Sequence, residues 1–362
     1  MARSKVPATR VERVEFEPLD IPLHEPFAIA TGSVTSARNA LVRITLADGA
    51  SGLGEAAPFP PSGGETQETA LAALAGMVPL VEGYDAAAWR PLAHRLTASF
   101  EHQATARAAM EVAVLDALTR SLGVPLFQFL GGAETQIETD ITIPIVDAAH
   151  MAQLAAGYAA RGARTLKLKV GTQVDADVER VLAVATGAPG CQLILDGNQG
   201  FSPADALRLI SDLASEKVRP VLFEQPVLRH DLAGLRFVTE RAGVPIAADE
   251  SVHSAADALR VARLGAASAV NIKLMKSGMV EALEIAAVCR AAGLELMVGG
   301  MIESRLGIAA SAHLIAGLGG FRYVDLDTPM LLADDPFTGG YTQTNMTYLL
   351  DASRAGLGVE RG

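Results

Sequence analysis

The stretch that decides the fold is residues 165–200, in which T-L-K-L-K-V-G (165–171) is followed by L-I-L-D-G-N (193–198). In the first run Lys167 and Lys169 alternate with apolar residues, and side chains two positions apart share one face of a strand. Both lysines therefore project to the same side, which is unusual for a buried strand. The second run ends on Asp196 and Asn198, and a helix-like segment follows it. The two runs indicate parallel strands with polar side chains at their ends.

The same arrangement repeats along the chain at intervals of 24–28 residues. Later apolar runs end on Glu224 (L-F-E-Q-P), Asp249 and Glu250 (I-A-A-D-E-S), Lys273 (V-N-I-K-L), Gly299 (L-M-V-G-G), and Asp325 and Asp327 (Y-V-D-L-D). With E-T-D-I-T-I-P-I (138–145) as the first, eight runs alternate with helical patterns, which we expect over 173–185, 203–216, 232–242, 255–264, 280–292 and 304–316. No G-x-G-x-x-G follows the first strand. The alternation therefore favours a closed TIM-type barrel over an open doubly wound sheet.

Residues 1–125 have a different pattern, which predicts an α+β capping domain. Two strand-like runs cover 11–20 and 40–50 and include a hairpin turn, A-D-G-A (47–50). Between them, P-F-A-I-A-T-G-S-V-T-S (26–36) is small and turn-forming, so we expect a mobile loop there. Helical spacing follows over 65–83 and 101–122. We assign 126–327 to a (β/α)₇β barrel and expect 328–362, which lacks a long helical pattern, to return to the capping domain.

Composition excludes several classes of protein. The chain has 362 residues and a net charge of −11, which argues against a nucleic-acid partner because such a partner requires a basic face. The first ten residues hold no apolar secretory segment, and no apolar run has membrane-spanning length, so we expect a cytoplasmic protein that does not bind membranes. Cys191 and Cys289 lack metal-type spacing and are expected to be core residues in a reducing compartment.

Charged residues gather where the active sites of barrels lie, at the C-terminal ends of the strands. Lys169 and Lys273 belong to strands 2 and 6, which face each other across the ring, so one can remove a proton from a carbon and the other can return it to the opposite face. Asp196, Glu224 and Asp249 come from strands 3, 4 and 5, and three carboxylates suit a hard cation such as Mg²⁺. Such a cation can bind a substrate carboxylate and stabilise its deprotonated α-carbon.

A lysine base must be partly neutral, and a neighbouring ammonium such as that of Lys167 would lower its pKa. Each residue alone also has an ordinary structural explanation. A lysine at a rim is often a surface group, and an aspartate at a strand end is often a helix N-cap. The matched positions of the whole set favour chemistry.

The motifs K-x-K (167–169), D-x-N (196–198), E-Q-P (224–226), A-D-E-S (248–251) and N-I-K (271–273) resemble the enolase superfamily, in the subgroup typified by muconate lactonizing enzyme. Sites of this superfamily use a Lys or His base with one or two Mg²⁺ ions. The resemblance implies an acid/base pair of Lys169 and Lys273, with Lys167 binding the substrate carboxylate. It implies one Mg²⁺ held by Asp196, Glu224 and Asp249, with Asn198 and Glu250 as supporting neighbours.

The D-L-D motif, Asp325 and Asp327, separates members of the subgroup. In its dipeptide epimerases a D-x-D on strand 8 binds the substrate ammonium, so the resemblance implies epimerisation, through an enediolate, of the C-terminal residue of a dipeptide. Alternatively, the pair is a structural one that hydrogen-bonds neighbouring loops. Thr142, Met301 and Glu303 match positions that line or support the dipeptide pocket. We also expect a homo-oligomer.

Specificity is inferred from a departure at Gly32, where similar enzymes acting on Ala-Glu carry an arginine. Residues 28–33 hold no charge, and Ile302 is apolar, so an ionic substrate side chain would lack a partner. We therefore expect hydrophobic or aromatic dipeptides, with a cationic preference still open. Within the superfamily the rivals are an o-succinylbenzoate synthase or an N-acylamino-acid racemase. Outside it they are a Schiff-base aldolase and a non-catalytic ligand-binding barrel.

Overall fold

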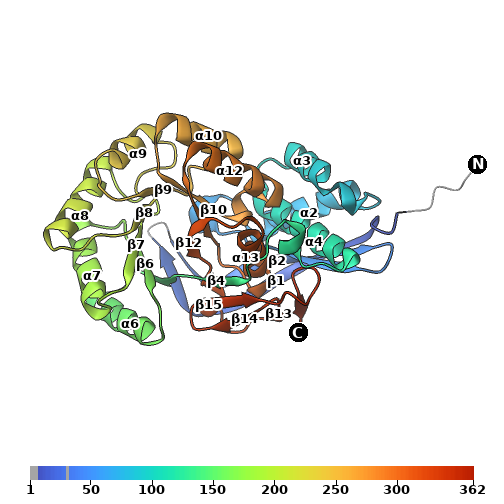
Figure 1. The fold of residues 1–362 in the computed structure, drawn as a ribbon, viewed down its shortest axis with the longest axis horizontal. Coiled ribbons are helices and arrows are strands. Elements are labelled where there is room, and N and C mark those ends of the chain that lie inside the picture. The colour runs from blue at the N-terminus through green and yellow to red at the C-terminus, as the bar shows by residue number, and fades with distance from the viewer. Residues whose placement is uncertain (1–6, 30–31) are drawn as a thin grey trace, which may run out of the picture.

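The computed structural model describes residues 7–29 and 32–362 and has a capping domain beside an α/β barrel (Figure 1). Eight parallel strands run round the barrel in chain order. They are β5 (Ile141–Ile143), β6 (Thr165–Lys169), β7 (Gln192–Asp196), β8 (Leu222–Glu224), β9 (Ile246–Ala248), β10 (Ala269–Ile272), β11 (Glu295–Gly299) and β12 (Phe321–Asp325). The first and last strands meet where Asp140 N donates to Val324 O at 2.9 Å. The sheet is thus nearly closed, and the predicted (β/α)₇β barrel is confirmed.

Helices cover the outside of the barrel between successive strands (Figure 1). They are α6 (Ala148–Ala160), α7 (Val174–Gly187), α8 (Pro203–Ser215), α9 (Leu232–Thr239), α10 (Ala255–Leu264), a short α11 (Leu274–Ser277), α12 (Met279–Ala292) and α13 (Arg305–Leu318). Serine N-caps explain sharp starts, since Ser202 and Ser254 accept from the amides of Asp205 and Asp257. The six predicted helices begin within one residue of their expected starts. Helix α6 was missed because its alanines give a weak pattern, and it buries only Met151 and Ala155.

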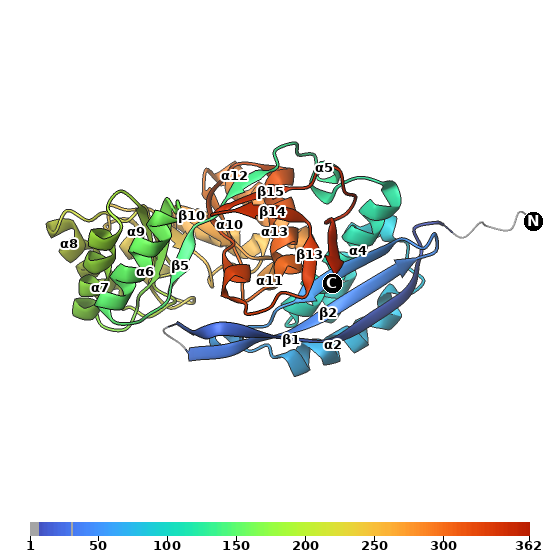
Figure 2. The same ribbon diagram turned by 90° about the horizontal axis from the view of Figure 1, so that it is seen from below.

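The capping domain is a three-stranded antiparallel sheet, β1 (Val11–Ile29), β2 (Gly32–Leu46) and β3 (Ser51–Ala56), packed on helices (Figure 2). Its helical elements are α1 (Pro60–Gly63), α2 (Gln67–Val81), η1 (Ala86–Ala88), α3 (Trp89–Ser99) and α4 (Ala104–Leu122). The short helix α5 (Leu126–Phe129) follows and packs mainly on α13 of the barrel. Strand β3 lies directly on α4, because a Cβ added to Gly54 would stand 2.0 Å from Ala109 O. Only glycine permits this approach.

The prediction of a loop over 26–36 is wrong for most of that segment. Strands β1 and β2 continue through it, pairing Phe27 with Val34 and Ile29 with Gly32. An antiparallel ladder supplies the hydrogen bonds that the small residues could not secure alone. Residues 30 and 31 of that expectation lie outside the described part of the chain.

The C-terminal segment contains four short strands, β13 (Phe337–Gly339), β14 (Tyr341–Thr344), β15 (Thr347–Leu350) and β16 (Val359–Arg361). Strand β15 pairs with β4 (Gln136–Glu138), just before the barrel begins. Leu357 N donates to the buried carboxylate of Asp116 in α4 at 2.7 Å, and Ala333 N donates to Pro22 O in β1 at 2.8 Å. These contacts join the segment to the capping domain.

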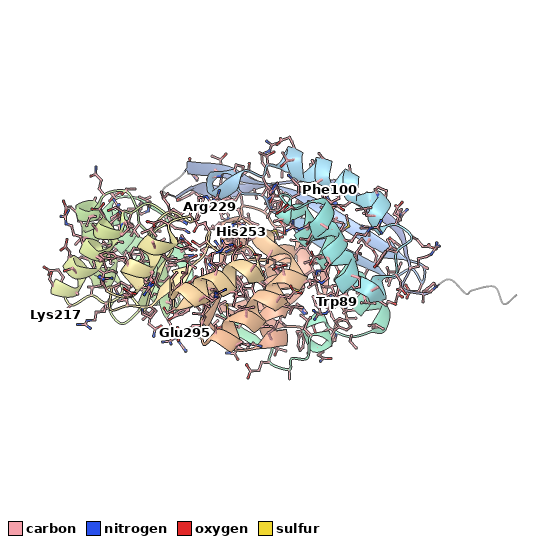
Figure 3. The ribbon with its side chains drawn as sticks, turned by 90° about the horizontal axis from the view of Figure 1, so that it is seen from above. Trp89, Phe100, Lys217, Arg229, His253 and Glu295 are labelled. Atoms are coloured by element: carbon pink, nitrogen blue, oxygen red, sulfur yellow. The ribbon has the colours of Figure 1, made fainter. Side chains whose placement is uncertain are left out.

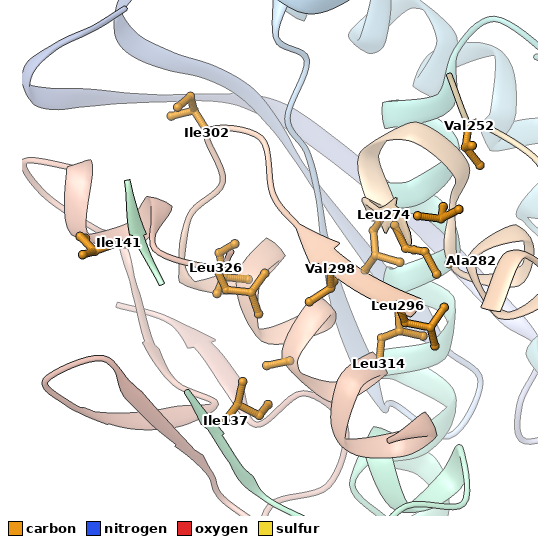
Figure 4. Close-up of a cluster of buried hydrophobic side chains, with 14 of the residues drawn as sticks. Ile137, Ile141, Val252, Leu274, Ala282, Leu296, Val298, Ile302, Leu314 and Leu326 are labelled. Atoms are coloured by element: carbon orange, nitrogen blue, oxygen red, sulfur yellow. The ribbon is translucent and has the colours of Figure 1, made fainter. Parts of the chain in front are cut away.

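Side chains along the barrel strands point alternately into the hydrophobic core and into the interior of the barrel. Leu166 and Leu168 of β6 belong to the hydrophobic core beneath the helices, whereas Lys167 and Lys169 point the other way, into the barrel. Figure 4 shows the same core around β11, where Leu296 and Val298 pack near Leu314 of α13. Among the helices of the described residues, none combines the length and apolar character needed to cross a membrane.

Candidate active site

Strand register brings the charged side chains to one level of the barrel. Lys169 pairs with Asp196 across β6 and β7, and Asp196 pairs with Glu224 across β7 and β8. Asp249 and Lys273 directly follow β9 and β10. All five residues are at least 93% buried. The strand-end charges predicted from the sequence therefore meet at one rim.

Lys167 lies one level deeper and is 1% exposed. Its Nζ is 2.6 Å from Asp325 Oδ2, 2.7 Å from Glu224 Oε2 and 3.0 Å from Asp196 Oδ2. Burial alone would lower the pKa of Lys167, but these carboxylates outweigh it and raise the pKa well above its usual value. Lys167 therefore stays charged and links the β7–β8 carboxylates to β12.

The two facing lysines each hold a carboxylate. Lys169 Nζ lies 2.7 Å from Asp196 Oδ2, and Lys273 Nζ lies 2.7 Å from Asp249 Oδ2. The sequence analysis missed Lys276, which donates to Asp249 Oδ1 and to Asp249 O, both at 2.6 Å. Its position in the sequence could have identified it. Lys276 lies three residues after Lys273, so one helical turn brings its side chain back to the site.

These ion pairs set the protonation of the site. Although burial opposes the change, Lys167 and Lys169 lower the pKa of Asp196, and Lys273 and Lys276 lower that of Asp249. Burial and the charge of Asp196 raise the pKa of Glu224 to about 8. Burial would lower the pKa of Lys273, but Asp249 reverses the effect and raises it. This direction is opposite to the one expected for a basic lysine, because carboxylates surround Lys273 more closely than other ammonium groups do.

The D-L-D carboxylates face β5. Asp325 pairs with Lys167, and Asp327 Oδ2 accepts from Thr142 N at 2.6 Å. Asp327 Oδ1 is buried and has no hydrogen-bond partner among the described residues. Burial and the charge of Asp325 raise the pKa of Asp327 to about 7. The hydrogen bond to Thr142 matches the alternative in which the D-L-D pair has a structural role. It leaves Asp327 Oδ1 free to accept a further hydrogen bond from a group outside the described residues.

Asp140, which immediately precedes β5, was missed. It is 3% exposed, and within the described ranges no group hydrogen-bonds to either of its carboxylate oxygens. Burial, followed by the charges of Asp325 and Asp327, raises the pKa of Asp140 well above its usual value. A protonated Asp140 can donate to Asp325, so three carboxyl groups adjoin at this side of the barrel.

One cavity contains most of these groups. It is lined by Lys169, Lys273, Lys276, Asp249, Asp325, Asp327, Thr142, Asn198, Glu250, Arg229, His253, Glu65, Ala104, Thr105, Thr328, Phe27, Phe59, Met275, Gly300, Met301, Ile302 and Leu331. Arg229 and His253, which the sequence analysis missed, lie where barrel loops face the cap (Figure 3). Glu303 does not line the cavity; its Oε1 accepts from Met301 N at 2.8 Å behind the wall. The cavity lining does not include Asp196, Glu224 or Lys167, which lie beneath it.

No group of three or more His, Cys, Asp or Glu side chains within the described ranges is already arranged around one cation position. The reason is that lysines bind these carboxylates: Lys273 and Lys276 hold Asp249, whereas Asp196 and Glu224 share Lys167. The donor set nevertheless fits a hard cation, since all-oxygen ligands come from three adjacent strands. Asn198 Oδ1 and Glu250 Oε2 are buried beside them and accept no hydrogen bond from the described residues. A cation would have to compete with Lys169 and Lys273 for their carboxylates.

Two family models match the chain. Residues 12–131 match the mandelate racemase / muconate lactonizing enzyme N-terminal domain, and residues 150–361 match the enolase C-terminal domain-like family. The chain belongs to the enolase superfamily. Its relatives include an aromatic dipeptide epimerase from Herpetosiphon aurantiacus, 47% identical over 97% of this chain and 99% of that protein. An L-Ala-D/L-amino acid epimerase from Populus trichocarpa is 42% identical over 94% of this chain and 82% of that protein.

A solved superfamily structure resembles the whole chain. It is a dipeptide epimerase from Enterococcus faecalis V583 complexed with Mg and the dipeptide L-Leu-L-Tyr, with a TM-score of 0.94 and 36% identity. The likeness covers 97% of this chain and 100% of that chain.

Proposed function

We propose that the chain is an isomerase, a Mg²⁺-dependent dipeptide epimerase that inverts the α-carbon of the C-terminal residue. The observation that carries the proposal is the placement of Lys169 and Lys273. They end strands four places apart in a ring of eight, both line one cavity, and carboxylates occupy the arc between them. Groups on opposite sides of a bound α-carbon suit proton removal from one face and return to the other.

In this mechanism one lysine, in its neutral form, accepts the α-proton at Nζ, and the other donates a proton from Nζ to the opposite face. The two lysines exchange roles for the opposite diastereomer. The lysine that acts as the base must first lose its own proton, because an ammonium such as those paired with Asp196 and Asp249 cannot accept one, whereas the lysine that acts as the acid keeps its proton. Lys167 remains charged beneath the cavity and holds Asp196, Glu224 and Asp325 in place.

Asp196, Glu224 and Asp249 would hold the Mg²⁺, with Asn198 and Glu250 beside them. When bound, the cation supplies Lewis-acid stabilisation of the substrate carboxylate as its α-carbon loses a proton. The unpaired oxygens of Asn198 and Glu250, described above, support this assignment because buried acceptors without donors are uncommon. The Mg in the Enterococcus faecalis relative independently supports the choice of cation.

Asp325 and Asp327 would bind the ammonium of the substrate's N-terminal residue, with Thr142 holding Asp327 in place. Asp327 Oδ1 is the acceptor that the fold leaves for it. The alternative, an o-succinylbenzoate synthase or N-acylamino-acid racemase, has substrates without an ammonium and leaves this acceptor unused. The D-L-D pair therefore favours dipeptides.

We propose hydrophobic or aromatic dipeptides as the preferred substrates. Phe27, Met275, Met301, Ile302 and Leu331 give the cavity apolar walls, and the relatives named above include an aromatic dipeptide epimerase. The argument from Gly32 alone is incomplete, however, because Arg229 of the β8–α9 loop also lines the cavity. An acidic side chain reaching Arg229 would find a cation there.

The test is deuterium incorporation, followed by NMR in D₂O with Mg²⁺, on L,L-dipeptides with acidic, basic, aliphatic and aromatic second residues. Deuterium at the C-terminal α-carbon together with the new diastereomer supports the proposal. Lys169→Ala and Lys273→Ala should each retain exchange with only one diastereomer, because each lysine serves one face. Failure of the whole panel, with exchange of an N-acylamino acid instead, would reject dipeptides in favour of the racemase alternative.

A further inference from the structure

A buried hydrogen-bond network joins the cap sheet to the barrel loop that carries Met301 and Ile302. Glu55 of β3 is 1% exposed, and its Oε1 accepts from Ser304 N at 3.0 Å. Its Oε2 accepts from Ser304 Oγ at 2.5 Å and from Gly307 N at 3.0 Å. A carboxylate of the cap thus satisfies amides in the first turn of a barrel helix, α13, where negative charge is favoured.

Asn39 of β2 completes the network. It is 1% exposed, and its Nδ2 donates to Glu55 Oε1 at 2.6 Å and to Ile302 O at 2.9 Å. Gln67 Nε2 in turn donates to Asn39 O at 2.7 Å, which fixes the β2 backbone on α2. Figure 4 shows Ile302 in this loop, close to the strands of the cap. The loop is therefore held from the cap at both Ile302 and Ser304.

Glu303 and Glu55 both lie against the first turn of α13. A Cβ added at Gly307 would stand 2.5 Å from Glu303 Oε2 and 3.0 Å from Glu55 Oε2, so both carboxyl groups contact the same turn. Glu303 Oε1 holds Met301 N, and Met301 and Ile302 form a wall of the substrate cavity. Movement of Glu55 would therefore move that wall.

We propose that Glu55, acting through Ser304 and Asn39, is a positioning residue that sets the location of Met301 and Ile302 and hence the size of substrate side chain the cavity accepts. The inference rests on the proposed function for its kinetic consequence, but not for its structural one. Glu55 touches neither the lysines nor the carboxylates of the site, so it acts on fit and leaves proton transfer and metal binding intact.

The test compares Glu55→Gln and Glu55→Ala with Asp116→Asn and Asp116→Ala. Asp116 is a matched control because it is 0% exposed, lies in the cap and accepts from Leu53 N at 2.9 Å and from Leu357 N at 2.7 Å, without contacting the loop. Both pairs of variants should lose thermal stability. Only the Glu55 variants should show faster amide hydrogen exchange over residues 300–308, measured by mass spectrometry.

The kinetic arm measures the ratio of kcat/KM for a dipeptide with a bulky C-terminal side chain to that for one with a small side chain. In Glu55→Gln the ratio should change on the order of tenfold to a hundredfold, since a displacement of about 1 Å has effects of that size. Mg²⁺ affinity, measured by calorimetry, should stay at the wild-type value. Glu55→Gln keeps this arm available even where Glu55→Ala does not fold.

Unchanged exchange over 300–308 and an unchanged ratio in Glu55→Gln would overturn the inference, as would equal changes in the Asp116 variants. Absence of turnover on any dipeptide by the wild-type protein would count against the proposed function instead. The hydrogen-exchange comparison would then still decide whether Glu55 positions the loop.

Discussion

Replacing Lys167 with methionine tests the charge balance of the barrel most directly. Methionine keeps much of the side-chain volume but leaves Asp196, Glu224 and Asp325 without the ammonium that lies within 3.0 Å of each of them. Removing one partner of a buried ion pair costs about 3–5 kcal/mol. With an unfolding entropy of about 2.1 cal/mol/K per residue, or about 0.76 kcal/mol/K for 362 residues, this predicts a fall in Tm of about 4–7 °C.

The loss should depend on pH in a defined direction. Lys167 helps to lower the folded-state pKa of Asp196 and Asp325 below 3.8, so its stabilising effect is present above that pH and is lost as the pH falls through the lowered values. Without Lys167 the buried carboxyl groups take up protons at higher pH. Acidification therefore removes the unpaired negative charge that destabilises the variant. The difference in Tm should therefore be larger at pH 8 than at pH 5.

Differential scanning calorimetry of wild type and Lys167→Met at both pH values measures this. Lys217→Met is the matched control, because Lys217 is an exposed lysine at the far end of the barrel from the cap (Figure 3). Saturating Mg²⁺ should restore part of the loss, since a cation on Asp196 and Glu224 replaces the missing charge. A change of less than about 1 °C at pH 8 would refute the reasoning, and so would equal losses at pH 5 and pH 8.

Three further outcomes are expected. Gly54→Ala should destabilise the protein by about 1–3 kcal/mol or more in urea unfolding, because its Cβ would meet Ala109 O at 2.0 Å. The control is Gly157→Ala in α6, whose Cβ meets nothing within 4 Å and which should stabilise the helix. Equal effects of the two substitutions on stability would contradict the close contact at Gly54. Asp327→Asn should lower kcat/KM for free-amine dipeptides about 10- to 150-fold, the loss of a hydrogen bond to a charged group, and unchanged dipeptide kinetics would contradict the ammonium assignment. Burial raises the pKa of Glu303 from 4.5 to about 8, so the folded protein retains a proton that the unfolded chain loses, and stability falls as the pH rises through that window. Glu303→Gln should therefore show a smaller Tm difference between pH 5 and pH 8 than wild type, and an identical difference would contradict a titrating Glu303.

The barrel could be predicted from the sequence because most of its strands show two signals, an apolar run and a charged residue at or just after its end. The period then fixes the order of the strands, and the order fixes which residues face each other. Segment 26–36 was interpreted wrongly because its strand-forming residues, such as Phe27 and Val34, are interspersed with Ala, Gly and Ser, and pairing of β1 with β2 decides the structure. The local sequence pattern predicts a strand correctly where its own residues favour that structure. It fails where pairing with a strand from elsewhere in the chain determines the structure.

Within the site, the sequence identified the groups but not their pairing. Lys167 was expected to lower the pKa of its neighbour through its charge, yet three carboxylates compensate that charge. Asn271 illustrates a different omission: its Nδ2 donates to Glu224 Oε1 at 2.7 Å, a contact between strands two places apart. The side-chain partners depend on distances inside the barrel, which spacing along the chain does not contain.

The charge balance of the site bears on the choice between dipeptides and N-acylamino acids. Four buried lysines face seven buried carboxyl groups, namely Lys167, Lys169, Lys273 and Lys276 against Asp140, Asp196, Glu224, Asp249, Glu250, Asp325 and Asp327. The excess of acids contributes, after burial, to the raised pKa values of Glu224, Glu250 and Asp327, at about 8, 7 and 7. Such a site gains most from cations. In the proposed assignment, Mg²⁺ would compensate the excess near β7–β9 and a substrate ammonium would compensate it near β12, whereas an N-acylamino acid would bring only another negative charge.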